Sequence, residues 1–341
     1  MRYLGVDLHT NSFTVCFREE SGRESFKTYS MKELLDFLFA LEENDVVAVE
    51  STGNTRFFVE SIQKAVKKVV VVDPNKFDVI KKSAKKTDEN DAQSLALFLS
   101  KDLIPEARMK TGLQAELGKL VSTRQTLIEQ RTALVNVIHN LLNAQGIKEK
   151  REALTTNKGL SRVLRVAKEE GFGGLACLQL EVLVTQITSL NQGIKKLEEQ
   201  MVEKGKQLEG HENLSSIKGI GDKSATILLT VIGNVNDFEN AGKLASYFGM
   251  VPSVRRSNGK VHYGPITKRG SKIGRTTIVQ CAWVAIRYNE YLANFYAGIK
   301  ERRGSAKAII ATANKLLGIV FETLKYRRIF TDFPNFKYIT A

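Results

Sequence analysis

Four acidic residues in the first hundred positions stand where carboxylates could gather around a metal ion. Asp88 and Asp91 are three apart at the start of an apolar run, and residues three apart share one face of a helix. Asp7 and Glu50 each end a short, apolar, strand-like segment. Acids at a helix N-terminus are also ordinary capping residues, so the helical pair alone leaves both interpretations open.

The four acids taken together favour Mg²⁺ chemistry. Mg²⁺ prefers oxygen ligands and needs only one or two carboxylates per ion when phosphate supplies the rest. Two such ions about 4 Å apart can clamp the attacking and leaving oxygens of a phosphoryl transfer. We therefore predict that Asp7, Glu50, Asp88 and Asp91 are metal ligands and catalytic residues.

A second candidate site lies in residues 251–275, which carry seven basic residues and no acid: Arg255, Arg256, Lys260, Lys268, Arg269, Lys272 and Arg275. Repeated turn signals predict that these cations lie on loops, where phosphates can reach them. Ser257 lies among them, and a serine hydroxyl becomes a nucleophile when a base or metal activates it and cations stabilise the developing charge. The alternative is that Ser257 only begins a Ser-Asn-Gly turn.

A glycine-containing turn upstream is a further candidate for phosphate contact. Gly219-Ile220-Gly221 joins two helical segments and is flanked by Lys218 and Lys223. In a helix-hairpin-helix such a turn presents backbone N–H groups to a phosphate, although an ordinary turn between helices has the same pattern. The net charge of +14 predicts attraction to polyanions, so we assign nucleic-acid contacts to Lys218, Lys223 and the seven cations of 251–275.

The expected secondary structure divides the chain into three domains. Residues 1–110 predict a mixed α/β sheet, because three early strands are followed by alternating helix and strand. Residues 111–210 carry apolar residues every seven positions, from Leu120 to Leu141, which is typical of a coiled-coil spacer. The sequence does not decide whether this coil forms within one chain or between chains. Residues 211–341 are expected to be mainly helical.

The remaining composition bounds the setting of the protein. The three cysteines are scattered without metal-ligand spacing, which is typical of a reducing compartment. No apolar run approaches the ~18 residues of a membrane span, and the first residues read as a strand rather than as a leader. We expect a cytosolic protein.

The acidic residues also carry a family resemblance. Their order resembles the RuvC and RNase H superfamily, and the segments Gly5-Val6-Asp7, Val49-Glu50-Ser51-Thr52-Gly53 and Lys86 to Ala92 look like the DEDD transposases of bacterial insertion sequences. Members of that family are understood as bridge-RNA-guided DNA recombinases. The resemblance implies a RuvC/RNase H-like N-terminal domain that holds Mg²⁺.

The C-terminal half is similar to the transposase domain of the same family. The matching residues are Pro252, Ser257 to Lys260, Gly264, Thr267 to Gly270, and Arg275. In that family a serine forms a covalent phosphoserine link to DNA. Many relatives have Ser-Gly or Ser-Ser-Gly where this chain has Ser257-Asn258-Gly259, which leaves Ser253 as an alternative nucleophile.

The resemblance implies a recombinase that excises and inserts its own element in the bacterial cytoplasm. Its implied partners are donor and target DNA, a structured bridge RNA, and further copies of the chain in a tetramer built as a dimer of dimers. Because a spacer separates the acids from Ser257, we expect one active site to combine two protomers. The alternatives are a hydrolytic RuvC-like junction resolvase and a non-catalytic nucleic-acid-binding scaffold. A scaffold need not retain all four acids.

Overall fold

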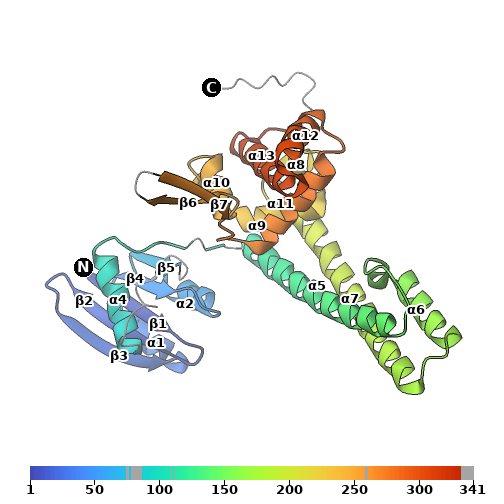
Figure 1. Ribbon diagram of the computed structural model, residues 1–341. Coiled ribbons are helices and arrows are strands. Elements are labelled where there is room, and N and C mark those ends of the chain that lie inside the picture. Colours follow the sequence, from blue (N-terminus) through green and yellow to red (C-terminus); the bar gives the residue numbers. More distant parts are fainter. Residues whose placement is uncertain (74–76, 78–86, 108, 111, 258–259, 332–341) are drawn as a thin grey trace. The chain divides into compact units, whose positions relative to one another are not determined.

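The chain divides into two compact units, Met1–Met109 and Lys110–Ala341. The computed structural model describes residues 1–73, 77, 87–107, 109–110, 112–257 and 260–331, and Figure 1 labels its elements. Each unit is described by itself below. The division into domains at residues 1–110, 111–210 and 211–341 stays a prediction.

Unit 1 is a five-stranded mixed sheet with strand order β3-β2-β1-β4-β5. The strands are β1 (Arg2–Leu8), β2 (Ser12–Glu19), β3 (Glu24–Ser30), β4 (Val46–Glu50) and β5 (Lys68–Val72). The first three pair antiparallel, whereas β4 runs parallel to both β1 and β5. This confirms the predicted mixed α/β sheet at the N-terminus.

The two faces of this sheet are covered by different helices. One face packs Leu4, Val6 and Leu8 against Phe37 of α1 (Leu34–Ala40) and Phe58 of α2 (Thr55–Ile62). The single turn η1 (Met31–Glu33) leads into α1. The other face is covered by α4 (Asp88–Ser100), whose buried residues are Ala92, Leu95, Ala96 and Leu99. Figure 1 shows α4 crossing the sheet on the side opposite α1 and α2.

Unit 2 begins with two long antiparallel helices, α5 (Gly112–Ala144) and α7 (Gly174–Gly205). Arg124 ion-pairs with Glu198, and Arg131 Nη1 donates to Asn191 Oδ1 at 2.9 Å. Moving forward along α5 from Arg124 to Arg131 therefore means moving backward along α7 from Glu198 to Asn191. The two helices run antiparallel and pair with each other within one chain. Between them η2 (Ala153–Thr155) and α6 (Asn157–Glu169) pack Leu154 and Leu160 onto the pair.

The rest of unit 2 is mainly helical, as predicted. Its elements are α8 (His211–Ser215), α9 (Asp222–Ile232), η3 (Val235–Asp237), α10 (Ala241–Tyr247), α11 (Lys272–Ala285), α12 (Glu290–Arg303) and α13 (Ser305–Lys325). The buried face of α13, which includes Leu316 and Val320, packs with Leu228 of α9 and Ile278 of α11 in the largest core.

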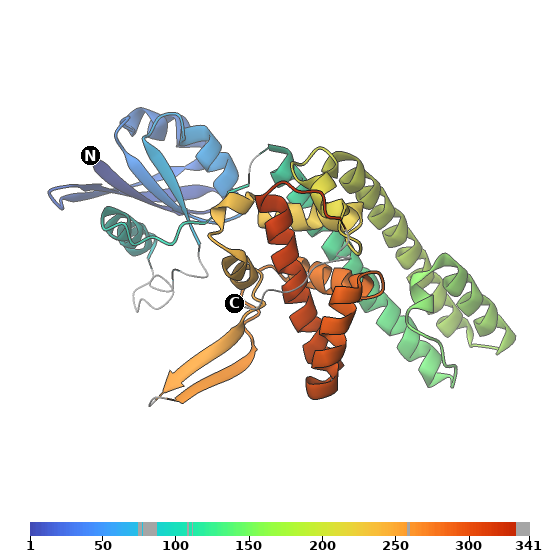
Figure 2. The ribbon, with the colours of Figure 1, turned by 90° about the horizontal axis from the view of Figure 1, so that it is seen from above.

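One part of unit 2 differs from the expectation. Residues 251–275 were expected to hold their cations on loops, but Arg255 and Arg256 lie on strand β6 (Pro252–Ser257), and β7 (Lys260–Ile266) begins at Lys260. Figure 2 shows this hairpin projecting from the helices of unit 2. Val254, Val261 and Tyr263 are residue types that favour strands, and they lie on one face of the hairpin; this outweighs the turn signals around them.

Candidate active site

The sheet of unit 1 places Asp7 and Glu50 next to each other. The parallel register pairs Gly5 with Ala48 and Val6 with Val49, so Asp7 and Glu50 each follow the last residue of their strand in this pairing. Side chains alternate between the faces of a strand, and therefore Asp7 shares with Gly5 the face that α4 covers. Both acids thus lie at the carboxyl ends of adjacent parallel strands, where α/β sheets place their functional crevices.

A glycine on β1 brings α4 to these strand ends. A Cβ at Gly5 would lie 2.0 Å from the Ala92 carbonyl oxygen and 2.4 Å from the Ala96 nitrogen, so any larger residue would hold the helix away. Thr87 caps α4, since its hydroxyl accepts from the Asn90 backbone N–H at 3.3 Å. The cap starts the helix at Asp88, and both Asp88 and Asp91 lie in its first turn.

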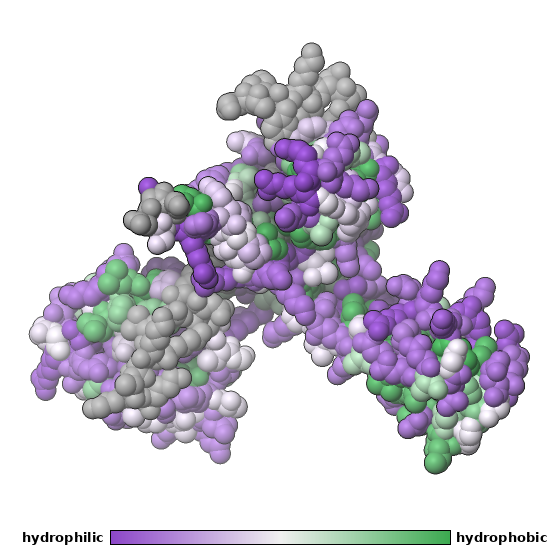
Figure 3. Space-filling view, in the orientation of Figure 1, coloured by the Kyte–Doolittle hydropathy of each residue, from purple (hydrophilic) through white to green (hydrophobic). Residues whose placement is uncertain are grey.

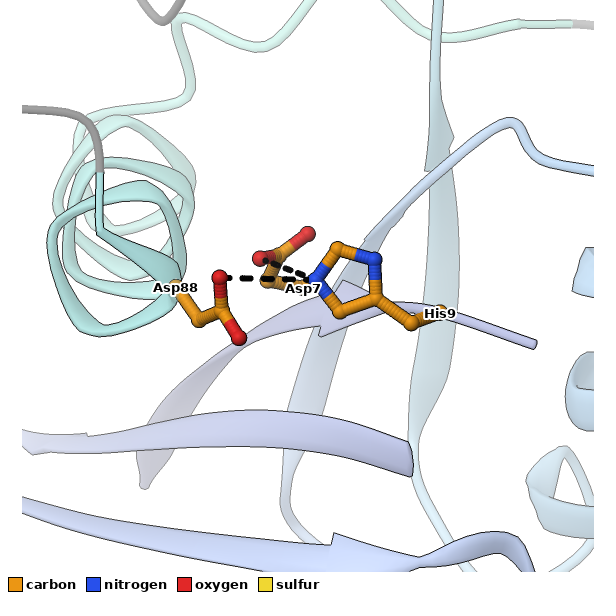
Figure 4. A group of neighbouring side chains, drawn as sticks. All are labelled: Asp7, His9 and Asp88. Carbon is orange, nitrogen blue, oxygen red and sulfur yellow. Dashed lines mark ion pairs between the residues drawn. The ribbon is translucent and has the colours of Figure 1, made fainter. Parts of the chain in front are cut away.

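The side chains of Asp7, His9 and Asp88 converge on one point. His9 Nε2 lies 3.2 Å from Asp7 Oδ2 and 3.5 Å from Asp88 Oδ1 (Figure 4). One ligand atom from each of the three residues lies within 4.8 Å of the others. An imidazole nitrogen and two carboxylate oxygens at this spacing are a donor set that could hold a divalent ion.

The acids also act on one another electrostatically. Burial raises the pKa of the Asp7 carboxyl, His9 lowers it, and the negative charges of Asp88, Asp91 and Glu50 raise it further, so that the pKa lies above its ordinary value. The charges of Glu50, Asp88 and Asp91 therefore act on Asp7, but among the described residues only Asp88 joins Asp7 and His9 in the group whose ligand atoms lie within 4.8 Å of one another. Negative charge gathered around Asp7, whose pKa is raised, fits a divalent cation, because the charge of the ion would offset the repulsion.

His9 was missed by the sequence analysis, although the sequence holds a signal for it. His9 is two residues after Asp7, and the strand period of two places both on one face. The backbone then fixes the residue: Asn54 Nδ2 donates to the His9 carbonyl at 2.8 Å, and the His9 N–H donates to the Ser12 carbonyl at 2.9 Å. Asn54 belongs to the turn that follows Glu50, so this turn supports two members of the site.

Ser257 lies on the exposed β6–β7 hairpin of unit 2. The register pairs Arg255 with His262 and Ser257 with Lys260. Paired residues project to the same face and alternate along each strand, so Ser257, Arg255 and His262 share one face. The alternative nucleophile, Ser253, is half-buried, and its hydroxyl lies against Gly264. His262 was not singled out from the sequence, because the hairpin itself was not foreseen.

The predicted DNA-binding cations fall into two groups. Arg255, Arg256, Lys268 and Arg269 expose their side chains to solvent. Two others lie on α11 rather than on loops: Lys272 Nζ is 3.0 Å from Glu129, and Arg275 Nη1 donates to the Phe248 carbonyl at 2.9 Å. Arg275 thus holds the C-terminal end of α10, which is a structural task. Ser271 caps α11, since its hydroxyl accepts from the Gly274 N–H at 3.1 Å.

The glycine turn before α9 is held by the core of unit 2. Gly219 has φ +111°, and a Cβ there would lie 2.8 Å from the Ala285 backbone nitrogen, so only glycine lets the turn approach α11. Lys223 Nζ is 3.0 Å from Glu198, which also binds Arg124. The side chain of Lys218 is exposed. Phosphate contact at Lys218 and Lys223 stays a prediction.

Comparisons with known proteins agree with this geometry. Residues 4–145 match a family model of DEDD transposases of the IS110 type, described as "Transposase", and residues 211–297 match the "Transposase IS116/IS110/IS902 family". The first range contains the four acids, and the second contains Ser257. Among the described residues, no helix is long and apolar enough to cross a membrane.

Several curated relatives align with nearly the whole chain. The transposase of insertion element IS1328 from Yersinia enterocolitica is 28% identical over 340 residues, which cover 96% of this chain and 98% of the relative. The transposase of IS1111A from Coxiella burnetii is 25% identical over 95% of this chain and 90% of the relative. A pilin gene-inverting protein of Moraxella lacunata is 25% identical over 96% of this chain and 97% of the relative.

These matches and the acidic site define a DNA-cleaving and rejoining enzyme of the transposase class. Its DEDD domain implies the use of a divalent metal, and its substrate is DNA. The chain is similar, over residues 4–145 and 211–297, to the models of the IS110-type DEDD and IS116/IS110/IS902 transposases, and its relatives include insertion-sequence transposases.

Proposed function

We propose that the protein excises and inserts its insertion element through attack of Ser257 on DNA phosphates, assisted by Mg²⁺. The observation that carries this proposal is that one chain holds two sites: the group Asp7, His9 and Asp88, whose ligand atoms lie within 4.8 Å of one another, and a serine on the same face as an arginine of an exposed hairpin. The strand order β3-β2-β1-β4-β5, with its acids at parallel strand ends, supports the RuvC/RNase H-like assignment of unit 1.

The residues of unit 1 would bind the metal. Asp7, Glu50, Asp88 and Asp91 supply the hard oxygen ligands that Mg²⁺ prefers, and His9 stands beside two of them. When bound, the ion would supply Lewis-acid polarisation of a phosphate oxygen. The protein keeps these carboxylates together through the β1–β4 register and the close approach of α4 to Gly5.

The residues of the hairpin would carry the covalent step. Ser257 Oγ forms a bond to phosphorus and the P–O3′ bond breaks, which leaves a 5′-phosphoserine and a 3′-hydroxyl. The serine proton leaves to water, and the departing O3′ takes up a proton. Arg255, on the same face as Ser257, can neutralise charge on the attacked phosphate. Attack of another 3′-hydroxyl on the phosphoserine rejoins the strand and releases Ser257.

The proposed partners are donor and target DNA, a structured bridge RNA and three further protomers. In this scheme base pairing selects the sequence, while the protein binds shape and backbone. The exposed cations of unit 2 support binding to the nucleic-acid backbone.

An exposed apolar surface supports the tetramer. Near its N-terminus α7 exposes Leu175, Leu178 and Val182, and Figure 3 shows hydrophobic surface at this end of the α5–α7 pair. The relative named as a pilin gene-inverting protein supports DNA recombination as the wider chemistry, and the proposed location is the bacterial cytoplasm.

The decisive experiment traps the covalent intermediate. A nicked suicide substrate is incubated with the protein, bridge RNA and Mg²⁺, and denaturing electrophoresis with peptide mapping locates any adduct. We expect DNA attached to Ser257 in the wild type and no adduct with Ser257→Ala, which loses one exposed oxygen. Ser253→Ala is the matched control and should still form the adduct.

Three other outcomes separate the alternatives. An adduct that maps to Ser253 would keep the mechanism and refute the residue. Cleavage that yields a free 5′-phosphate without attached protein would favour the hydrolytic resolvase. Binding of RNA and DNA without any cleavage would favour the non-catalytic scaffold.

A further inference from the structure

The solvent face of α11 carries a tryptophan, and the turn that follows the helix exposes a tyrosine. The helix buries Ile278, Cys281, Ala282 and Ala285. On its opposite side Trp283 is 39% exposed, and Tyr288 in the turn that follows is 62% exposed. The outer face of a surface helix is normally polar, and clustered exposed apolar residues mark binding surfaces.

Trp283 belongs to a fixed pair of rings that joins α11 to α12. Its ring centroid is 5.7 Å from that of Tyr296, in an edge-to-face arrangement. The Tyr296 hydroxyl is 2.8 Å from Ser305 Oγ at the start of α13, so the ring is held at both its edge and its hydroxyl. Trp283, Tyr288 and Tyr296 are called the aromatic surface below.

One cation lies beside the aromatic surface, and the segment that carries the surface is basic. Lys300 Nζ lies 5.9 Å from the centroid of Tyr296. Residues 283–307 contain five basic residues, Arg287, Lys300, Arg302, Arg303 and Lys307, against two acids, Glu290 and Glu301. Exposed aromatic rings without excess charge would suit the surface of a protein partner. Aromatic rings together with excess positive charge suit a polyanion that also has flat apolar faces.

We propose that the aromatic surface binds single-stranded nucleic acid by base stacking. Every base has a π-face, so stacking on aromatic side chains binds unpaired strands without sequence preference, and nearby cations follow the phosphates. Bases within a duplex are already stacked and offer no such face. The inference rests on the proposed function, in which a guide RNA or an opened DNA strand must be held.

Trp283 is the single tryptophan of the chain, so its fluorescence reports on this surface alone. The full-length protein is titrated with an oligouridylate, an oligothymidylate, and a DNA duplex of the same length. We expect saturable quenching of Trp283 emission by single strands and little by the duplex. Quenching by the RNA strand only, or by the DNA strand only, identifies which source the surface serves.

Matched variants test whether the rings supply affinity. Stacking on one aromatic residue is worth a factor of about 5 to 150 in affinity, so Trp283→Ala should weaken single-strand binding by that factor in fluorescence anisotropy of a labelled strand. Trp283→Phe keeps a ring and should keep most of the affinity. Lys300→Gln changes only an exposed side chain, and it should weaken binding and reduce its salt dependence.

The control is a similar ring at the other end of α13. Tyr326 is 57% exposed and lies 4.9 Å from the guanidinium of Arg328. It follows the 21-residue helix that begins at Ser305, which places it about 30 Å away along the axis. Tyr326→Ala should leave single-strand binding unchanged.

Four results would overturn the proposal. The first is constant Trp283 emission while anisotropy shows a saturated complex, and the second is equal quenching by the duplex. The third is an equal loss of affinity in Tyr326→Ala. The fourth is an emission change on dilution of the protein alone, which would indicate that a second copy of the chain occupies this surface. Ser257→Ala should bind single strands normally. If Ser257→Ala still forms an adduct, the serine mechanism fails while the binding result stands.

Discussion

The two candidate sites are built in opposite ways. The acids of unit 1 are set by a buried sheet and a helix that approaches Gly5 closely, and the Asp7 side chain is only 12% exposed. Ser257 lies at the end of an exposed strand whose partner is the other arm of the same hairpin. The acidic site is therefore organised by folding, whereas the hairpin relies on strand pairing alone.

This difference indicates what each site needs before it can function. A metal site functions when its ligands are already in place, because preorganised charge costs little to arrange during the reaction. A nucleophile on an exposed hairpin needs a bound strand to exclude water and to fix the phosphate. We infer that substitutions in unit 1 act through the fold, and that those on the hairpin act through nucleic-acid binding.

The largest effect is expected at Gly5. In Gly5→Ala the new Cβ would lie 2.0 Å from the Ala92 carbonyl oxygen, so α4 must move and take Asp88 and Asp91 with it. We expect cleavage and divalent-ion binding to be lost, with unfolding easier by about 1–3 kcal/mol. Chemical denaturation measures the change in the free energy of unfolding, and calorimetric titration measures divalent-ion binding. Gly53→Ala, whose Cβ would meet no atom within 4 Å, should keep its stability, and an equally stable Gly5→Ala would contradict the packing argument.

Two arginines that the sequence treats alike should behave differently. Arg255→Gln on the hairpin should lower the slope of log affinity against log salt by about 0.9 and leave the unfolding free energy unchanged. Arg275→Gln removes a donor to the Phe248 carbonyl and should destabilise unit 2 by about 1 kcal/mol. Binding titrations at several salt concentrations and denaturant unfolding distinguish the two. If both variants changed the salt dependence of binding and the free energy of unfolding in the same way, the two arginines would not differ in role.

The smallest effect concerns stability and pH at Asp7. Because the folded pKa of Asp7 lies above its ordinary value of 3.8, the native state binds more protons between these two values. Stability therefore falls as pH rises through this window and stays lower above it. Metal-free Asp7→Asn should then be more stable than the wild type at neutral pH, with a difference that disappears below the ordinary pKa. Denaturant unfolding across pH measures it, and a less stable variant at neutral pH would refute the origin of the shift.

Much of unit 1 could be predicted from its sequence, because its signals are local. Apolar runs ending in Asp7 and Glu50 became adjacent strands, and Thr87 with Asp88 began a helix. His9 escaped because its role depends on the approach of Asp88 from a distant helix. The sequence shows that Gly5 lacks a side chain, but only the packed helix shows why that matters.

Unit 2 was less predictable because its charges are sorted by long-range contacts. A run of seven cations looks uniform, yet Lys272 and Arg275 are engaged by Glu129 and Phe248, which are distant in sequence. The pairing of β6 with β7 was not predicted, because the turn signals around these strands are stronger in the sequence than the strand-forming residues themselves. The long helices were predictable from their heptads, but their pairing within one chain depends on contacts such as Arg124 with Glu198.

The return of α7 along α5 has a consequence for how such proteins diversify. The first turn of α5 and the last turns of α7, which form one end of the pair, are both anchored on α9: Gln114 Nε2 donates to the Leu229 carbonyl at 2.9 Å, and Thr226 Oγ1 donates to the Met201 carbonyl at 3.3 Å. The pair extends about 50 Å from this base, given the 33 residues of α5. Matched insertions or deletions of whole heptads in both helices would change the reach of the arm and leave its base in place. Arm length is thus free to evolve independently of the fold that carries Ser257.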